Sequence, residues 1–303
     1  MVRWWWCFAL WWCMVPALAA PAGALTGPGS HELSLRHEGR ERGFIVHVPK
    51  TYRADRPVPL VLALHGGGGS MDVMARDRLY GLVSQSEASG WIVVFPNGYS
   101  RLAGKFATWN AGICCGAARD KGSDDVGFLR AVVAEVQRRL AIDPRRIFAT
   151  GMSNGGMMSY RLACEASDVF RAIAAVAGTD GTTDCRPGRP VPVLHIHAKD
   201  DDRVLFNGGS GSASDTHADF VSVPATVDQW ARRNACSGPA QTVLQRPGVT
   251  CEVRSGCAGG VEVRLCVTDS GGHAWPGGRK ALGGRGSTAL DATAEIWDFF
   301  ARQ

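Results

Sequence analysis

The stretch Arg146-Ile147-Phe148-Ala149-Thr150-Gly151-Met152-Ser153-Asn154-Gly155-Gly156 indicates the architecture of the chain. Residues 146–150 are typical of a buried strand, and a helix is expected from about Asn154. Between them lies the pattern Gly-x-Ser-x-Gly, which the chain contains once. A serine on such a sharp strand-to-helix turn is typical of a nucleophile, and its flanking glycines let neighbouring backbone pass closely. The alternative is a glycine-rich turn with a capping serine.

Apolar runs and helical spacing alternate along the rest of the chain. Residues 60–65 and 91–95 are continuous apolar runs, as in buried parallel strands. A helix is expected from a cap at Ser123 or Asp124 to a stop at Asp143-Pro144. We also expect a leading hairpin at 31–37 and 43–48, strands at 172–176, 191–197 and 261–267, helices at 223–234 and 289–300, and a surface loop near the site at 207–218. This order predicts an α/β fold, with a mainly parallel central sheet flanked by helices.

Composition excludes several classes of protein. The chain has 303 residues, of which 45% are hydrophobic and 20% are charged, and this excludes intrinsic disorder. The 38 glycines show no Gly-X-Y period, so a collagen-like chain is excluded. The formal net charge is 33 − 28 = +5, and the basic residues are spread along the chain. No nucleic-acid partner is therefore expected.

The first 24 residues are expected to be a signal peptide. Arg3 precedes the apolar run of residues 4–15, and small residues favour cleavage after Ala19 or Ala24. The run is too short to span a bilayer, so no stable membrane insertion is expected after cleavage. The mature chain, residues 25–303, is expected to be one domain that is secreted to the periplasm or the extracellular space. An uncleaved membrane anchor is the alternative.

The cysteines support export. Of 10 cysteines, Cys7 and Cys13 belong to the signal, which leaves 10 − 2 = 8 in the mature chain. An even number in a secreted chain favours disulfides. The four cysteines clustered between residues 236 and 266 are expected to pair among themselves. A zinc site is the alternative, but the spacing of two CxxC pairs is missing, so no metal is expected.

A serine nucleophile needs a base, and the base needs an orienting acid. His273 follows Ser153 in a glycine-rich loop after the late strand, as the order nucleophile–acid–base requires. The acid should follow the strand at 191–197, where three aspartates are adjacent, and spacing does not choose among Asp200, Asp201 and Asp202. His195 and His197 lie on that strand and are expected to pack in or near the core.

The negative oxygen of a tetrahedral intermediate needs two backbone N–H donors. Asn154, directly after the nucleophile, supplies one. The turn His65-Gly66-Gly67-Gly68-Gly69 follows an apolar strand, and glycine-rich turns of this kind supply the second donor in esterases. We assign this donor to Gly66 or Gly67. A phosphate-binding loop is the alternative, but no Lys-Ser or Lys-Thr pair follows the glycines.

Six segments together carry a family resemblance: Leu64-His65-Gly66-Gly67-Gly68-Gly69-Ser70, Phe95-Pro96-Asn97-Gly98, Trp109-Asn110-Ala111-Gly112 with Cys114-Cys115-Gly116, Asp124-Asp125-Val126-Gly127-Phe128, Gly151-Met152-Ser153-Asn154-Gly155-Gly156 and Gly272-His273-Ala274-Trp275-Pro276-Gly277-Gly278. From about Gly43 onward the chain resembles the secreted α/β-hydrolase esterases that include poly(3-hydroxybutyrate) depolymerases and feruloyl esterases. The resemblance implies that the acid is Asp201, four residues after His197, although Ala198 stands where the family usually has glycine.

The resemblance also implies hydrolysis of a small-molecule or polymeric ester through an acyl-enzyme, with no metal or organic cofactor. Trp109 and Trp275 are candidates for an aromatic-walled substrate pocket; the alternative is that they pack under loops. Whether the natural ester is feruloyl, another plant-wall ester or a short polyester stays open. Two other classes also stay open: a secreted serine peptidase of the same fold, and a non-catalytic surface protein.

Overall fold

The computed structural model describes Leu25 and residues 27–216, 218–280 and 283–303. The predicted signal peptide lies outside the described residues. In the part that is described, no helix combines the length and apolar character needed to cross a membrane.

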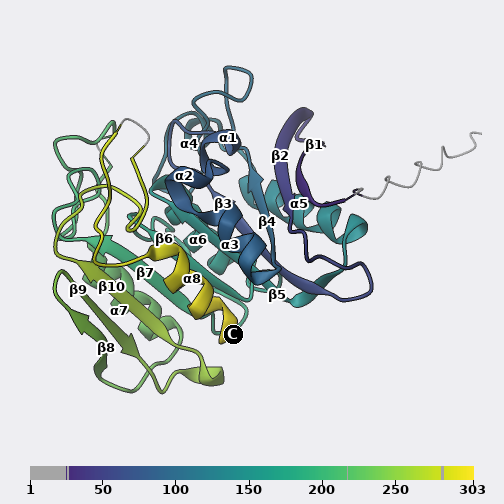
Figure 1. Cartoon of the computed structure of the whole chain (residues 1–303). Coiled ribbons are helices and arrows are strands. Elements are labelled where there is room, and N and C mark those ends of the chain that lie inside the picture. The colour runs from purple at the N-terminus through teal and green to yellow at the C-terminus, as the bar shows by residue number, and fades with distance from the viewer. Residues whose placement is uncertain (1–24, 26, 217, 281–282) are drawn as a thin grey trace, which may run out of the picture.

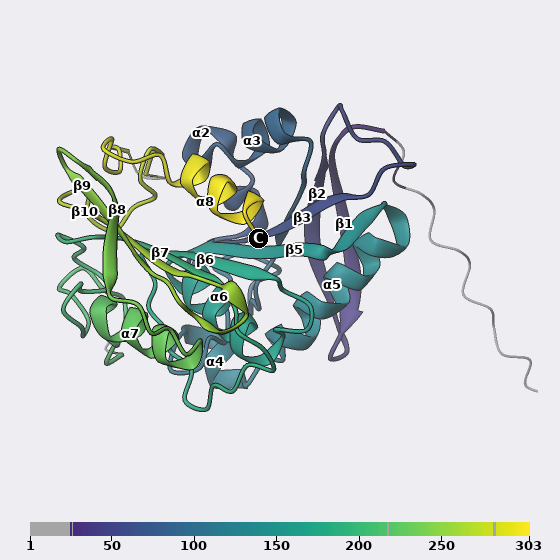
Figure 2. The same ribbon diagram turned by 90° about the horizontal axis from the view of Figure 1, so that it is seen from below.

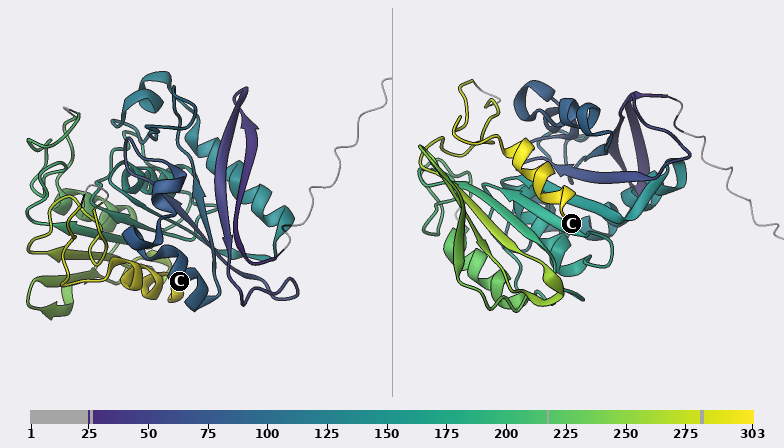
Figure 3. Two further views of the ribbon diagram at one scale, coloured as in Figure 1. Left: turned by 45° about the horizontal axis from the view of Figure 1, so that its top comes forward. Right: turned by 60° about the horizontal axis from the view of Figure 1, so that its bottom comes forward.

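A ten-stranded sheet runs through the molecule in the order β1-β2-β4-β3-β5-β6-β7-β10-β9-β8 (Figure 1). Six adjacent strands are parallel: β4 (Ile92–Pro96), β3 (Val58–Leu64), β5 (Ile142–Met152), β6 (Ala172–Val176), β7 (Val193–Ala198) and β10 (Val263–Thr268). Antiparallel hairpins extend the sheet at its two ends, β1 (Gly29–His37) with β2 (Arg40–Val48), and β8 (Ala240–Arg246) with β9 (Val249–Arg254) (Figure 3). The predicted mainly parallel sheet is confirmed.

Helices cover both faces of this sheet, as the view along its edge shows (Figure 2). One face carries α2 (Asp77–Tyr80), α3 (Leu82–Ser89) and α8 (Ala292–Ala301); the other carries α4 (Gly116–Lys121), α5 (Asp125–Arg139), α6 (Asn154–Glu165) and α7 (Val223–Arg233). The short helix α1 (Met71–Met74) belongs to the first face, because Met71 and Met74 pack in the same core as Leu82 of α3. A single 3-10 turn, η1, spans Ala258–Gly260. Along β3 the side chains alternate between the two cores: Leu60, Leu62 and Leu64 face one, and Val61 and Ala63 face the other. Burial on both faces explains the continuous apolar run in the sequence.

The predicted elements form close to their expected bounds, with one shift. Asp124 caps α5 by accepting the Gly127 N–H at 2.9 Å. The helix ends at Arg139, before the expected stop at Asp143-Pro144, because those two residues already belong to β5. The short helices α1 to α4 and the hairpin β8–β9 were not expected from the sequence.

Disulfides pair eight cysteines of the described residues. Cys236 pairs with Cys257 and Cys251 with Cys266, as the clustering predicted, and the other pairs are Cys164–Cys185 and Cys114–Cys115. The pair Cys251–Cys266 joins facing residues of β9 and β10. These bonds occupy the sulfur atoms that a zinc site would need.

Candidate active site

Ser153 occupies a strained turn at the carboxyl end of β5. Its backbone has φ 55° and ψ −121°, a conformation that residues with a side chain rarely adopt. Glycine is required at the neighbouring positions because other backbone atoms lie where a side chain would be. A Cβ at Gly151 would lie 2.4 Å from the Gly155 carbonyl carbon, and a Cβ at Gly155 would lie 2.2 Å from the Leu64 oxygen. Glycine at these two positions therefore allows the close approach of β3, β5 and α6 at the turn that carries Ser153.

Asp201 and His273 meet at the same edge of the sheet. Asp201 follows β7, His273 follows β10, and His273 Nδ1 lies 2.9 Å from Asp201 Oδ2. Asp201 Oδ1 also accepts the backbone N–H groups of Arg203 and Val204, both at 2.9 Å. Burial opposes the ionisation of Asp201, but hydrogen bonds from His197 and His273 outweigh it and hold the pKa of this carboxyl well below its usual value. The carboxylate is thus fixed as an acceptor for Nδ1–H, which leaves Nε2 of His273 free to act as a base.

The two neighbouring aspartates are placed differently. Asp200 accepts the backbone N–H groups of Gly271 and Gly272, at 3.2 and 2.8 Å, and so holds the loop that carries His273. Asp202 is exposed. Residue spacing did not decide which of the three adjacent aspartates orients His273. Their contacts distinguish them, because Asp201 bonds to the His273 ring whereas Asp200 holds its loop.

The nucleophile candidate lies at the same edge without a bond to the base. Ser153 follows β5 and Asp201 follows β7, and only β6 separates these strands. Among the described residues, the Ser153 hydroxyl has no hydrogen-bond partner, His273 included. Catalytic hydrogen bonds are often long in the free protein and tighten when substrate binds.

The glycine-rich turn after β3 lies against this serine. A Cβ at Gly66 would be 3.5 Å from Ser153 Cβ, and one at Gly67 would be 3.6 Å from Asn154 Cβ. Gly68 and Gly69 donate their N–H groups to Ala107 and Gly66. Neither Gly66 nor Gly67 donates its N–H to another residue in the described part of the chain. Their N–H groups are thus available to a ligand beside the nucleophile.

Trp109 is not a wall of an open pocket. Its side chain is fully buried, and the Asn154 amide clamps its backbone, accepting Trp109 N–H at 2.7 Å and donating to its carbonyl at 3.0 Å. Trp275 is 3% exposed, and its Nε1 donates to Thr293 Oγ1 at 2.9 Å. The expectation that these indoles line a substrate pocket is corrected: in this structure both pack beneath the loops of the site.

His65 has a positioning role that sequence reasoning missed. Its Nδ1–H donates to the Gly66 carbonyl at 2.8 Å, and its Nε2 accepts the Gly98 N–H at 3.0 Å. Burial lowers the pKa of His65 to about 4, so the ring is neutral at neutral pH. The Gly66 carbonyl and the Gly67 N–H belong to one planar peptide group, so this bond also sets the direction of the Gly67 N–H. The position of His65 directly before four glycines was the available signal.

A buried ion pair supports the loop on the other side of Asn154. Arg42 and Asp125 lie 2.7 Å apart, and Asp125 Oδ2 also accepts the Asn110 N–H at 2.7 Å. Burial lowers the pKa of Arg42, against the effect of Asp125. The acidic motif at 124–128 therefore holds the Trp109-Asn110 segment in place.

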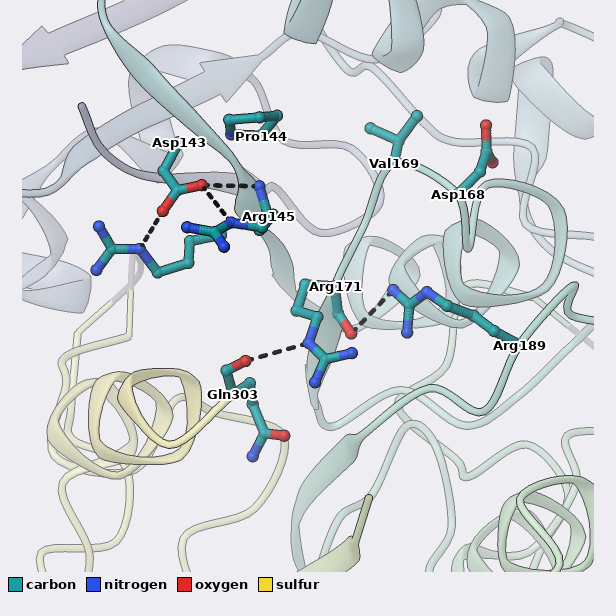
Figure 4. A pocket seen from close by; sticks show the side chains of 9 residues that line it. Asp143, Pro144, Arg145, Asp168, Val169, Arg171, Arg189 and Gln303 are labelled. Carbon is teal, nitrogen blue, oxygen red and sulfur yellow. Dashed lines mark hydrogen bonds and ion pairs between the residues drawn. The ribbon is translucent and has the colours of Figure 1, made fainter. Parts of the chain in front are cut away.

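A hollow of about 670 Å³ lies at the amino ends of the parallel strands, which we call the amino edge (Figure 4). Its lining includes Asp143, near the start of β5, with Arg171 and Arg189, which precede β6 and β7. Ser153 lies at the carboxyl end of β5, so this hollow is not the candidate active site.

Solved structures share the fold. The acetyl xylan esterase from Aspergillus awamori superposes with a TM-score of 0.62 at 14% sequence identity, over 90% of this chain and 100% of that one. At this identity the likeness shows the fold alone: the molecule is an α/β-hydrolase.

Sequence relatives place the chain within that class. It is 32% identical to the putative esterase NocK of Nocardia uniformis subsp. tsuyamanensis, over 86% of this chain and 79% of that protein. It is 30% identical to a probable feruloyl esterase C of Aspergillus niger, over 87% and 85%. Residues 115–186 also match the prolyl oligopeptidase family. The chain belongs to an α/β-hydrolase family of esterases, which are carboxylic ester hydrolases of the serine hydrolase type.

One relative is much longer than this chain. Feruloyl esterase B of Piromyces equi is 34% identical over 241 residues, which are 77% of this chain and 42% of that protein. The similarity therefore spans less than half of the fungal protein.

Proposed function

We propose that this esterase works through an acyl-enzyme on Ser153, with His273 as the general base and Asp201 as the acid that orients it. The Asp201–His273 hydrogen bond of 2.9 Å, at the sheet edge that carries the strained serine, is the observation that supports this assignment most strongly. Asn154 and either Gly66 or Gly67 donate the two N–H groups that hold the negative oxygen of the intermediate.

The reaction has two acyl transfers. His273 Nε2 takes the Ser153 proton as the hydroxyl oxygen attacks the ester carbonyl, and the buried Asp201 carboxylate stabilises the imidazolium that forms. The imidazolium then protonates the leaving alcohol, which departs and leaves an ester on Ser153. Water repeats the sequence and releases the carboxylic acid. Each proton that leaves a nucleophile is returned to a leaving group, so the enzyme ends unchanged.

For the substrate, we propose an ester of ferulic acid. The names of several fungal relatives, matched over more than four fifths of their length, support this choice. A polyester of hydroxybutyrate, which the sequence also suggested, is the competing substrate. We further propose that residues 1–24 direct export and that residues 25–303 form one esterase domain. The disulfides support an oxidising compartment.

Purified protein tests these proposals against a panel of methyl ferulate, short p-nitrophenyl esters, hydroxybutyrate oligomers and a peptide amide. We expect turnover of methyl ferulate, labelling by a fluorophosphonate probe, and loss of both in Ser153→Ala, with kcat lowered roughly 10⁴- to 10⁶-fold. Full turnover by Ser153→Ala would overturn the nucleophile. A higher kcat/KM on the oligomers would overturn the substrate, and a higher value on the amide would favour a peptidase.

A further inference from the structure

A row of buried polar side chains leads from Asp201 into the core, away from His273. His197 Nε2 lies 3.3 Å from Asp201 Oδ2 and 2.8 Å from the Val204 carbonyl oxygen. His197 Nδ1 lies 3.1 Å from His195 Nε2, and His195 Nδ1 lies 2.7 Å from the Tyr160 hydroxyl. Tyr160 and His195 are 0% exposed and His197 is 1% exposed, so bulk solvent does not reach them.

The fold aligns these groups. His195 and His197 are two residues apart on β7, so their rings lie on one face of the strand, with centroids 5.2 Å apart and planes within 7°. Tyr160 lies on α6, the helix that begins directly after Ser153. The row therefore links the helix behind the nucleophile to the strand that carries the acid.

The contacts fix where each proton lies. Val204 O and the Asp201 carboxylate are both acceptors, so His197 Nε2 carries a hydrogen. In a neutral ring Nδ1 is then an acceptor, and it receives the Nε2–H of His195. His195 Nδ1 is in turn an acceptor, and it receives the Tyr160 hydroxyl hydrogen. One neutral arrangement satisfies all of these atoms. Its last hydrogen, on His197 Nε2, bonds to the Val204 carbonyl oxygen at 2.8 Å and lies beside Asp201 Oδ2, which is 3.3 Å from Nε2.

The surroundings favour this neutral arrangement. Burial lowers the pKa of His195 well below its ordinary value, and the neighbouring His197 adds to that effect. Burial raises the pKa of Tyr160 well above its ordinary value, so its hydroxyl keeps its hydrogen. A second proton on His197 would also place its Nδ1–H against the Nε2–H of His195.

We propose that Tyr160, His195 and His197 form a directional hydrogen-bond chain that positions the Asp201 carboxylate for His273. The proposal rests on the proposed function, in which Asp201 orients the base. Asp201 Oδ1 is held by two backbone N–H groups, whereas Oδ2, the closer partner of His273, has His197 Nε2–H as its other neighbour. His197 thus restrains rotation of the carboxylate about its Cβ–Cγ bond. The three residues are positioning residues, since none of them is proposed to touch the substrate.

Nitrogen-15 NMR of the histidine rings tests the chain of hydrogen bonds without any reference to turnover. In the full-length protein at neutral pH, we expect His195 and His197 both to be neutral Nε2–H tautomers with slowly exchanging ring protons. An Nδ1–H tautomer or an imidazolium at either position overturns the proposal. Ser153→Ala should give the same two signals, so this result stands or falls separately from the proposed esterase chemistry.

Kinetics on the preferred ester test the positioning role. His197→Phe removes the donor beside Asp201, and we expect kcat to fall roughly 10- to 100-fold with little change in KM. His197→Gln returns an amide N–H near the position of Nε2 and should recover most of that loss. Tyr160→Phe leaves His195 Nδ1 without a donor and should change the ring signals of both histidines. A folded His197→Phe variant with kcat within twofold of wild type, or an equal loss in the Phe and Gln variants, overturns the proposal.

Discussion

At the carboxyl edge of the parallel strands, Asp201 is buried, and N–H donors from two backbone groups and His273 converge on it. At the amino edge of the same strands, charged groups surround an open hollow of about 670 Å³. There Asp143 accepts the Arg145 N–H and pairs with Arg146, and Arg189 donates to the carbonyls of residues 170, 171 and 190. At one edge, hydrogen-bond donors surround a buried carboxylate, whereas arginines line an open hollow at the other.

Volume alone therefore does not point to the candidate active site. A hollow lined by arginines that already bind neighbouring carbonyls has few groups free for chemistry. The carboxyl edge instead combines a strained serine, N–H groups beside it and an oriented imidazole. Convergence of directed donors and acceptors is the feature that catalysis needs.

We expect the largest difference in kcat between two aspartate-to-asparagine variants, one at each edge. Asp201→Asn keeps the size of the side chain but loses the charge that stabilises the His273 imidazolium, so we expect kcat to fall roughly 10⁴-fold. Asp143→Asn at the amino edge should leave kcat within about twofold. Initial rates on the preferred ester, with circular dichroism of both variants, measure the contrast. Equal activity of the two variants would contradict the assignment of Asp201.

Much of the carboxyl edge could be predicted from the sequence, because its signals are local. The strand before Gly151, the serine and the glycines that follow form one continuous stretch. The choice among Asp200, Asp201 and Asp202 could not be made from spacing, because it depends on contacts with residues 271–273. Trp109 bonds to the Asn154 amide, 45 residues away, so sequence alone could not decide between a pocket wall and a side chain packed under the loops.

The hairpin β8–β9 was missed for a different reason. Five of the seven residues of β8 are exposed, and its sequence, AQTVLQR, lacks the apolar alternation that predicts a strand. Such a strand forms because β9, which Cys251–Cys266 links to β10, offers it a partner. Pairing of this kind is a property of the assembled sheet.

The second contrast compares the stability effects of two glycine-to-alanine substitutions, one beside Ser153 and one near the amino edge. A Cβ at Gly155 would lie 2.2 Å from the Leu64 oxygen, whereas a Cβ at Gly188, near the amino edge, would lie 3.6 Å from Ser167 Oγ. We expect Gly155→Ala to lower the free energy of unfolding by about 3 kcal/mol or more, through overpacking against backbone. Gly188→Ala should change it by less than about 1 kcal/mol. Urea unfolding midpoints test both, and a stable Gly155→Ala protein would contradict the close approach at the turn.

The third contrast is in pH. His65 at the carboxyl edge has a pKa lowered to about 4 from an ordinary value of 6.5, so the unfolded chain binds the extra proton between these values. Stability should therefore fall as the pH decreases from about 6.5 to 4, by up to about 3 kcal/mol from this residue. His195, whose pKa is also lowered, acts in the same direction.

Asp143 at the amino edge acts in the same direction but in a lower pH range. A hydrogen bond from the Arg145 N–H lowers its pKa, so its contribution is present above its ordinary pKa of 3.8 and is lost only below that value. Urea unfolding at about pH 7, 5.5 and 4.5 should show a decline in wild type and a shallower one in His65→Asn. An equal decline in the two proteins would remove His65 as a cause.

The smallest expected effect is a loss of stability at the amino edge that leaves activity unchanged. Arg189 donates to three backbone carbonyls near the starts of β6 and β7, and burial lowers its pKa. Arg189→Met keeps much of the side-chain length but loses these bonds, so we expect a loss of about 1–2 kcal/mol in the free energy of unfolding. Arg145→Met, at a side chain that is 90% exposed, is the matched control and should cost less than about 0.5 kcal/mol.

Neither arginine variant should change kcat by more than about twofold, because the amino edge lies at the opposite ends of the strands from Ser153. Loss of activity in a folded Arg189→Met protein would show that the arginine-lined hollow acts on the reaction. In that case the two edges would be coupled through β6 and β7, the strands that run from this hollow to the carboxyl edge.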